Sequence, residues 1–391
     1  MDRRAFLVSA SAAHAMQSSN LPRVGLIGAG GRGKLLTAEF KEVGATVGAV
    51  CDVYQPNLEA GLKAASTGAT AFSDYRKLLE DKSVQAVIVA TPDHWHARMV
   101  IDAVNAGKDV YVEKPMTHEA AEAFDVIAAV RRTKRIVQVG TQRRSSPLFQ
   151  DGRALAQSGK LGDDRLVTSQ WLNYQAGLNM RPLDGTLDWK QWLGKAPQRE
   201  MDPVRFRNWY YYWDYSGGLL IGQAAHMVDS IQWFMGTGVP SAVTCAGGQV
   251  NLKPAEIPET ASINLEYSQV NLFATFTLGY KAMRYHTHND QMAQYHGSKA
   301  RLDVGRESYT LWPEQGAALQ LRPDVTRDEP GAFNRATREH IRNFLDCIRS
   351  RKDPNAPVEE GMKTAVALVM TLESLRSGRR VKWDAANRRI V

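Results

Sequence analysis

RVGLIGAGGRG, at residues 23–33, indicates the architecture of the N-terminal part of this chain. A short apolar run leads into Gly28-x-Gly30-x-x-Gly33, and a helical pattern begins at Lys34. In a dinucleotide-binding unit the first glycine permits a tight turn, the second lets the backbone approach the phosphates, and the third lets helix and strand pack closely. Glycine-rich loops match this pattern by chance, so its context has to support it.

Asp52 supplies that context. A second apolar run at 46–51 ends at this residue, about 20 residues after the glycines, where a carboxylate binds a ribose hydroxyl. The same carboxylate repels a 2′-phosphate, and no arginine occurs among residues 53–56. The sequence therefore predicts NAD as cofactor in preference to NADP.

Residues 23–140 alternate between strand-like and helical patterns with short connections. This alternation predicts a parallel sheet covered by helices, an α/β Rossmann domain at 21–145. The expected strands are 24–27, 46–51, 86–90, 109–112 and 136–139, and the expected helices are 35–43, 55–65, 75–79, 97–106 and 119–132.

After Thr141 the pattern changes to longer strands of alternating polarity. This texture predicts an α+β domain at 146–391 with a mostly antiparallel sheet, whose C-terminal helices we expect to pack back on the first domain. The expected strands are 166–171, 242–246, 262–267, 271–277, 292–296 and 308–312, and the expected helices are 148–156, 337–351 and 359–376.

Composition excludes several classes of protein. The chain has 391 residues, a length that favours two domains. Its net charge is +8, and its lysines and arginines are scattered along the sequence. Its densest basic cluster, at 131–135, is typical of an exposed helix end, so we predict no nucleic-acid partner. Cys51, Cys245 and Cys347 are far apart, and we expect Cys51 to be a buried free thiol. No apolar run is long enough to span a bilayer.

The first residues resemble a twin-arginine export signal. Arg3 and Arg4 precede small and apolar residues, and Ala13-His-Ala15 resembles a cleavage site. We therefore expect residues 1–20 to be a signal and the protein to be periplasmic. The alternative is an ordinary disordered N-terminus on a cytoplasmic protein.

Polar side chains follow the predicted strand ends, the edge where parallel α/β sheets bind ligands. Thr91-Pro-Asp-His-Trp-His96 and Glu113-Lys114-Pro115 each follow a strand, and an apolar segment at 217–229 carries His226.

Lys114 and His226 are the candidates for proton chemistry. Moving a hydride from a carbinol carbon to nicotinamide requires the hydroxyl proton to leave, and histidine is the natural base. A partly desolvated lysine can hydrogen-bond the oxygen. Pro115 restricts the backbone after Lys114, and we expect a cis peptide there. A core histidine and a surface lysine are the alternatives.

Together these motifs resemble the Gfo/Idh/MocA oxidoreductases, the family that includes glucose–fructose oxidoreductase and inositol dehydrogenase. The resemblance extends over nearly the whole chain after residue 22, and it also includes Gly217-Gly218 and Asp229 around His226. It implies a Rossmann domain, an open-faced C-terminal sheet, a tightly held nicotinamide cofactor, and a sugar or cyclitol substrate. We therefore predict an NAD-dependent oxidoreductase that acts on a sugar or glycoside hydroxyl. By the same resemblance Lys114 is the substrate-binding and catalytic lysine, His226 acts on the reacting hydroxyl, and the chain forms a homodimer or homotetramer.

Gly222 departs from the family pattern. Family dehydrogenases usually carry an aspartate four residues before this histidine, and on a helix that aspartate would lie beside His226. Its absence leaves two alternatives to an ordinary dehydrogenase. One is a redox-neutral glycosidase or lyase that oxidises a sugar transiently and eliminates the aglycone. The other is a non-catalytic sugar-binding or sensing protein.

The predicted site combines these motifs with an aromatic region at 189–215, because flat aromatic faces suit sugar rings. Packing under a long loop is the alternative for about half of these aromatic residues. The predicted cofactor-binding residues are Gly28, Gly30, Gly31, Arg32, Gly33, Asp52, Thr91, Pro92, His96, Glu113 and Lys114. The predicted substrate-binding residues are His96, Lys114, Trp209, Tyr211, Gln223 and His226.

Several histidines have the spacing of metal ligands. His94 and His96 flank a tryptophan without an obvious third ligand, and His286, His288 and His296 fall on predicted strands. Solvent-facing strand histidines are the interpretation we favour for the second group, so no metal ion is predicted.

Overall fold

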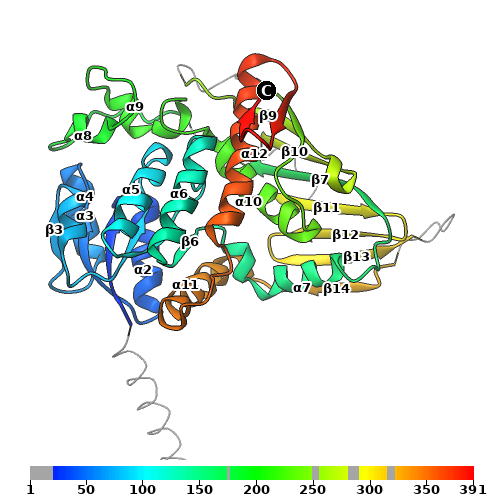
Figure 1. Ribbon diagram of the computed structural model, residues 1–391, viewed down its shortest axis with the longest axis horizontal. Coiled ribbons are helices and arrows are strands. Elements are labelled where there is room, and N and C mark those ends of the chain that lie inside the picture. Colours follow the sequence, from blue (N-terminus) through cyan, green and yellow to red (C-terminus); the bar gives the residue numbers. More distant parts are fainter. Residues whose placement is uncertain (1–20, 174–176, 249–254, 281–289, 315–321) are drawn as a thin grey trace, which may run out of the picture.

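The computed structural model describes residues 21–173, 177–248, 255–280, 290–314 and 322–391 (Figure 1). The predicted export signal at 1–20, and His286 and His288, lie outside these ranges. Among the described residues no helix is both long and apolar enough to cross a membrane. Cys51 is a buried free thiol, as expected.

The N-terminal part is a six-stranded parallel sheet in the order β3-β2-β1-β4-β5-β6, which confirms the predicted Rossmann architecture. The sequence pattern missed β3, because three residues are too few to show a period. The strands are β1 (Arg23–Ile27), β2 (Thr46–Cys51), β3 (Thr70–Phe72), β4 (Ala86–Val89), β5 (Asp109–Val112) and β6 (Val137–Val139). The helices are α2 (Gly31–Glu42), α3 (Gln55–Ala64), α4 (Tyr75–Glu80), α5 (Asp93–Asn105) and α6 (Ala120–Thr133).

The second sheet has ten strands in the order β14-β13-β12-β11-β7-β10-β9-β8-β15-β16. It is mixed rather than purely antiparallel, because β7 lies between β11 and β10 and pairs parallel with β10. The strands are β7 (Asp164–Asn173), β8 (Ala242–Gly248), β9 (Thr260–Tyr267), β10 (Leu272–Tyr280), β11 (Gln291–Gly297), β12 (Ala300–Gly305), β13 (Ser308–Pro313), β14 (Val325–Asp328), β15 (Val381–Asp384) and β16 (Arg389–Ile390).

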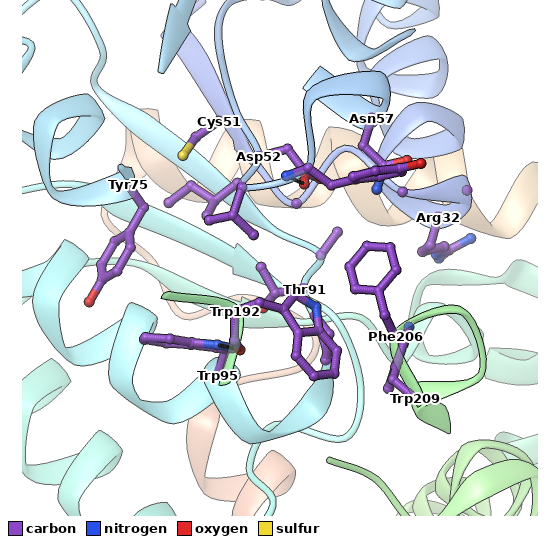
Figure 2. A pocket seen from close by; sticks show the side chains of 18 of the residues that line it. Arg32, Cys51, Asp52, Asn57, Tyr75, Thr91, Trp95, Trp192, Phe206 and Trp209 are labelled. Carbon is purple, nitrogen blue, oxygen red and sulfur yellow. Dashed lines mark hydrogen bonds between the residues drawn. The ribbon is translucent and has the colours of Figure 1, made fainter. Parts of the chain in front are cut away.

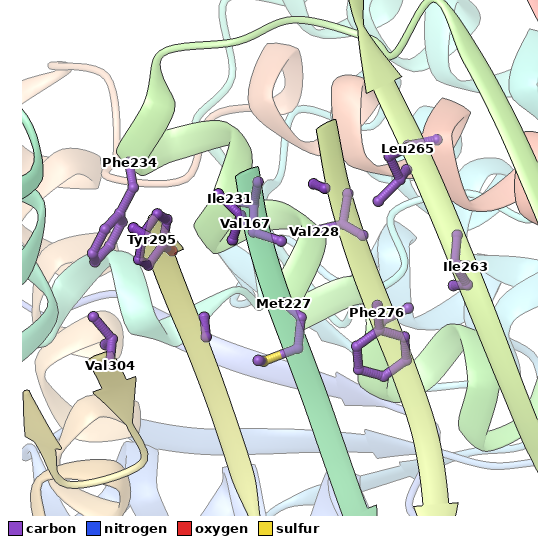
Figure 3. Close-up of a cluster of buried hydrophobic side chains, with 14 of the residues drawn as sticks. Val167, Met227, Val228, Ile231, Phe234, Ile263, Leu265, Phe276, Tyr295 and Val304 are labelled. Atoms are coloured by element: carbon purple, nitrogen blue, oxygen red, sulfur yellow. The ribbon is translucent and has the colours of Figure 1, made fainter. Parts of the chain in front are cut away.

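Three helices, α7 (Pro147–Ala156), α10 (Gly218–Met235) and α12 (Val358–Ser377), pack on one face of this sheet. Figure 3 shows the resulting core, in which Val228 and Ile231 of α10 face Val167 and Phe276 of the strands. Nearly all of α10 is buried, so its helical position is determined by packing rather than by local propensity.

Another C-terminal helix, α11 (Ala332–Ser350), belongs to the core of the first sheet. Ile341 and Phe344 are buried in the same apolar cluster as Leu26 and Phe40. The chain thus returns to the nucleotide-binding sheet after completing the second one, and the domain division at residue 145 stays a prediction.

Residues 177–216, here called the covering segment, cross over the carboxyl edge of the first sheet (Figure 1). The segment contains α8 (Trp189–Leu193), α9 (Pro203–Arg207) and the 3-10 turn η2 (Trp209–Tyr211). Its backbone bonds to the loop after β2: Gln55 N donates to Thr186 O at 2.9 Å, and Asp188 N donates to Val53 O at 3.0 Å. These bonds hold the covering segment directly beside Asp52.

Candidate active site

The glycine motif forms a loop that a larger residue would fill. Gly28 has φ of +91°, which favours glycine, and a Cβ on Gly33 would lie 2.0 Å from the carbonyl oxygen of Gly28. In contrast, a Cβ on Gly30 or Gly31 would meet nothing within 4 Å. Helix α2 begins at Gly31, so open space adjoins a helix N-terminus, as binding of a pyrophosphate requires.

Asp52 lies at the end of β2, beside this loop. Its carboxylate accepts hydrogen bonds from Ala29 N at 2.7 Å and Tyr54 N at 2.9 Å. Burial raises the pKa of Asp52, and these backbone donors oppose that rise. Asp52 also lines the cavity beside this loop, where its carboxylate can accept a ribose hydroxyl.

A cavity of about 310 Å³, here called the nucleotide cavity, is lined by Gly28, Gly30, Gly31, Asp52, Thr91 and Pro92 among others. Figure 2 shows Phe206 and Trp209 of the covering segment opposite Asp52 and Asn57. Arg207 also reaches this cavity, but its guanidinium donates to the carbonyl oxygens of Arg181 and Pro182. The loop, the helix terminus and the acidic strand end therefore fit NAD.

A second cavity of about 370 Å³, here called the catalytic cavity, adjoins the first. The two share Arg32, Ala90, Thr91 and Trp209 in their walls. The walls of the catalytic cavity also include Glu113, Lys114, Gln142, Trp171, Tyr210, Gln223 and His226. The structure thus brings together side chains from β5–α6, η1 (Gln142–Ser145), β7, the covering segment and α10.

Lys114 extends from the end of β5 to helix α10, where its Nζ donates to the carbonyl oxygen of Gly222 at 2.9 Å. Burial lowers the pKa of Lys114, and the carboxylates of Glu113 and Asp93 partly oppose this. Glu113 accepts from Arg32 Nε at 2.7 Å and from the backbone N of Lys114 at 3.2 Å. The Lys114–Pro115 peptide is cis, as expected.

His226 lies one turn after Gly222 on the same helix, with its ring 5.8 Å from the ring of Trp171. Burial lowers its pKa well below 6.5, and the nearby cations of Lys114, Arg143 and Arg32 add to this effect. The imidazole is therefore neutral at neutral pH, the form in which it can accept a proton.

Three buried polar atoms of residues lining the catalytic cavity have no hydrogen-bond partner among the described residues: His226 Nδ1, Gln142 Oε1 and Trp171 Nε1. Leaving such atoms unpaired costs about 1–3 kcal/mol each, so buried polar groups normally find partners. No sequence motif marks Gln142 or Trp171, so neither is among the predicted site residues. Their unpaired atoms are available to hydrogen-bond a polar ligand in this cavity.

His96 lies on the catalytic cavity wall, but both of its ring nitrogens are within hydrogen-bond distance of backbone carbonyls. Nδ1 is 2.7 Å from Pro115 O, and Nε2 is 2.9 Å from Thr91 O. Helix α5 begins at Asp93 rather than at residue 97 as expected, and this directs His94 away, toward Trp192 O at 3.2 Å. His96 therefore connects two strand-end loops, and its predicted contact with substrate stays a prediction.

Trp209 and Gln223 lie in the catalytic cavity wall, whereas Tyr211 lines neither cavity. Consecutive residues of a 3-10 turn point about 120° apart. In η2 this brings Tyr210, and not Tyr211, to the cavity. The aromatic composition marked the right segment, but only the turn decides which ring faces the site.

Asp229 follows His226 in the family-like motif yet is absent from both cavity walls. Its carboxylate accepts from Arg144 Nε at 2.9 Å, and Arg144 also bonds to Glu360 at 3.0 Å. Arg144 is 4% and Asp229 2% exposed, so this ion pair is internal and joins α10 to η1.

No cluster of potential metal ligands occurs in the described part of the chain. His296 lies on β11, with Nε2 3.1 Å from Thr168 Oγ1.

Comparison with known proteins gives consistent matches over most of the chain. Residues 22–141 match the family model of the Gfo/Idh/MocA oxidoreductases that describes their NAD-binding Rossmann fold. The model for the C-terminal alpha/beta domain of the same oxidoreductase family matches residues 188–383.

Individual relatives are more distant. The uncharacterised oxidoreductase YrbE of Bacillus subtilis is 26% identical over 362 residues, covering 90% of this chain and 94% of its own. The scyllo-inositol 2-dehydrogenase (NAD(+)) of Bacillus subtilis is 24% identical over 316 residues, covering 80% and 81%. The structure of levoglucosan dehydrogenase in complex with NADH and levoglucosan superposes with a TM-score of 0.72 at 16% identity, covering 92% and 99%. At that identity the likeness shows a shared fold.

Proposed function

The chain belongs to the Gfo/Idh/MocA family of NAD-dependent oxidoreductases acting on CH–OH groups, and from this premise we propose that it oxidises a ring hydroxyl of a sugar or glycoside with a tightly bound NAD. The observation that supports this most is the catalytic cavity, where unpaired polar atoms lie beside Lys114 and His226. Scyllo-inositol and levoglucosan, named for two similar proteins, are polyhydroxylated rings of the kind that such a cavity suits.

In this mechanism NAD, when bound, accepts the hydride from the carbinol carbon. Gly30, Gly31 and Asp52 would hold its pyrophosphate and ribose. Neutral His226 takes the hydroxyl proton on a ring nitrogen as the C–H bond breaks. Lys114, whose Nζ is held by Gly222 O, donates a hydrogen bond to the same oxygen and stabilises its developing negative charge. The covering segment excludes water and retains the nucleotide.

A redox-neutral glycosidase or lyase is the second candidate, and one observation favours it. Position 222 carries no carboxylate, and Lys114 bonds to a backbone carbonyl there instead. A site that oxidises transiently, eliminates the aglycone and returns the hydride would need no net NAD, which suits an enzyme that retains its cofactor.

The test is a panel of sugars, cyclitols and aryl glycosides, in which NADH absorbance and released aglycone are followed together. NADH accumulation with added NAD and without aglycone supports the dehydrogenase. Aglycone release without net NADH supports the redox-neutral cycle. Ligand binding without turnover on any substrate would support a sugar-binding or sensing protein.

We also propose twin-arginine export to the periplasm and assembly as a homodimer or homotetramer. Arg3 and Arg4 support export, and the family resemblance supports assembly. Replacing both arginines by lysine should retain the protein in the cytoplasm, as fractionation would show. Light scattering of the purified protein tests the assembly.

A further inference from the structure

The space left by the glycine at position 222 is filled by another residue. A Cβ built on Gly222 would lie 1.3 Å from the hydroxyl oxygen of Tyr210 and 2.6 Å from its Cζ. The phenol therefore occupies the volume into which a side chain at position 222 would extend. In relatives with an aspartate there, that volume would belong to the carboxylate.

Tyr210 reaches this position from the covering segment, where it is part of η2. Its side chain lines the catalytic cavity together with Lys114, Gln223 and His226. Lys114 Nζ lies against the same glycine, 2.9 Å from its carbonyl oxygen. The phenol and the ammonium group thus converge on one residue, one helical turn before His226.

The phenol also has the protonation state of a donor. Burial raises its pKa well above 10.0, and the nearby carboxylates of Asp93 and Glu113 add to that rise. At any working pH the hydroxyl keeps its proton and can donate a hydrogen bond.

We propose that Tyr210 is a catalytic residue of the proposed hydroxyl oxidation, with its phenol donating a hydrogen bond to the reacting oxygen from the place of the missing carboxylate. As the C–H bond breaks, the hydride leaves for the nicotinamide and the hydroxyl proton passes to His226. Tyr210 keeps its own proton and stabilises the negative charge that develops on the oxygen. Unlike an aspartate at position 222, a phenol does not repel that negative charge. Lys114 and Tyr210 therefore both stabilise it.

This inference rests on the proposed function, and Tyr210→Phe tests it directly. Because the variant keeps the ring and removes only the hydroxyl, kcat should fall by about 10²-fold, as on loss of one donor to an oxyanion. The KM, the NAD affinity and Tm should stay close to wild type. Tyr212→Phe is the matched control, since Tyr212 lies in the same segment but lines neither cavity. Wild-type kcat in Tyr210→Phe, or equal losses of kcat in both variants, would overturn the proposal.

Gly222→Ala provides a second, independent test. Its methyl group would displace the Tyr210 hydroxyl, so this variant should lose kcat to the same degree as Tyr210→Phe, and the double variant should lose no more. Losses that multiply in the double variant would show that the two positions act separately, and would overturn the proposal.

The shared volume is also measurable without turnover. Gly222→Ala should lower Tm in the wild-type background and lower it less in a Tyr210→Ala background, where the methyl group has room. If no substrate is found, this comparison of Tm changes in the two backgrounds still tests the packing of Tyr210 against Gly222. The proposed function is decided by the substrate panel alone. Equal Tm changes in both backgrounds would refute the placement of Tyr210.

Discussion

We expect alanine at Gly33 and alanine at Gly30 to damage the protein in different ways. A Cβ at position 33 would lie 2.0 Å from the Gly28 carbonyl oxygen, so helix α2 has to move by about 1.4 Å to reach ordinary contact at 3.4 Å. Overpacking of this kind costs about 1–3 kcal/mol, and the better helix propensity of alanine returns about 1 kcal/mol. The net loss of up to ~2 kcal/mol corresponds to a Tm decrease of roughly 4–8 °C.

At Gly30 the protein itself offers no obstacle. Nothing lies within 4 Å of an added Cβ, and φ of −67° with ψ of −169° is open to any L-residue. The Tm of the nucleotide-free protein should therefore stay at the wild-type value. NAD affinity should fall at least tenfold, or about 1.4 kcal/mol, because the methyl group extends toward the bound pyrophosphate.

Thermal unfolding of the nucleotide-free variants and calorimetric titration with NAD distinguish the two effects. Gly238→Ala is the control, because its Cβ also meets nothing within 4 Å and it lines neither cavity. It should change neither Tm nor affinity. Wild-type NAD affinity in Gly30→Ala would refute the assignment of this loop to the pyrophosphate.

Four further outcomes follow from the site and its surroundings. Lys114→Ala and His226→Ala should each abolish turnover while NAD still binds, because both side chains line the catalytic cavity and not the nucleotide cavity. Full activity in either variant would refute the catalytic role of the residue replaced. In the pH profile of kcat/KM, the acid limb should lie below pH 6.5 and the alkaline limb below pH 10.5, because burial lowers the pKa of both His226 and Lys114. His226 then stays neutral at lower pH than a free histidine, and Lys114 loses its proton at lower pH than a free lysine. Limbs beyond these bounds would contradict the assignment. Asp52→Ala should weaken NAD binding in calorimetry, and unchanged affinity would mean that Asp52 does not contact the ribose. Asp229→Asn should lower the free energy of unfolding in urea by about 3 kcal/mol, because it leaves Arg144 buried with one carboxylate fewer. A loss as small as that of a surface ion pair would show that the internal pair is weak.

Much of the nucleotide-binding half could be predicted because its information is local. The glycine motif, the strand ending at Asp52 and the cis peptide at Pro115 each depend on residues close together in the chain. A turn, a helix start and a buried strand have short periods that a single sequence displays. The second sheet was predicted less completely, since the parallel pairing of β7 with β10 joins strands about a hundred residues apart.

The catalytic cavity shows where such prediction ends. Lys114 and His226 were identified from their motifs, but Trp171, Gln142 and Tyr210 carry no local mark. They meet because β7, η1, the covering segment and α10 pack around one space.

By itself, then, the sequence determined the Rossmann half, the preference for NAD and the two candidate catalytic side chains. Only the tertiary structure decided that Asp229 belongs to an internal ion pair, that Tyr210 replaces Tyr211 at the cavity, and that its hydroxyl fills the space at Gly222. The physical reason is that backbone preference and hydrophobic period act within one element. Which side chains share a cavity depends instead on how several elements pack together.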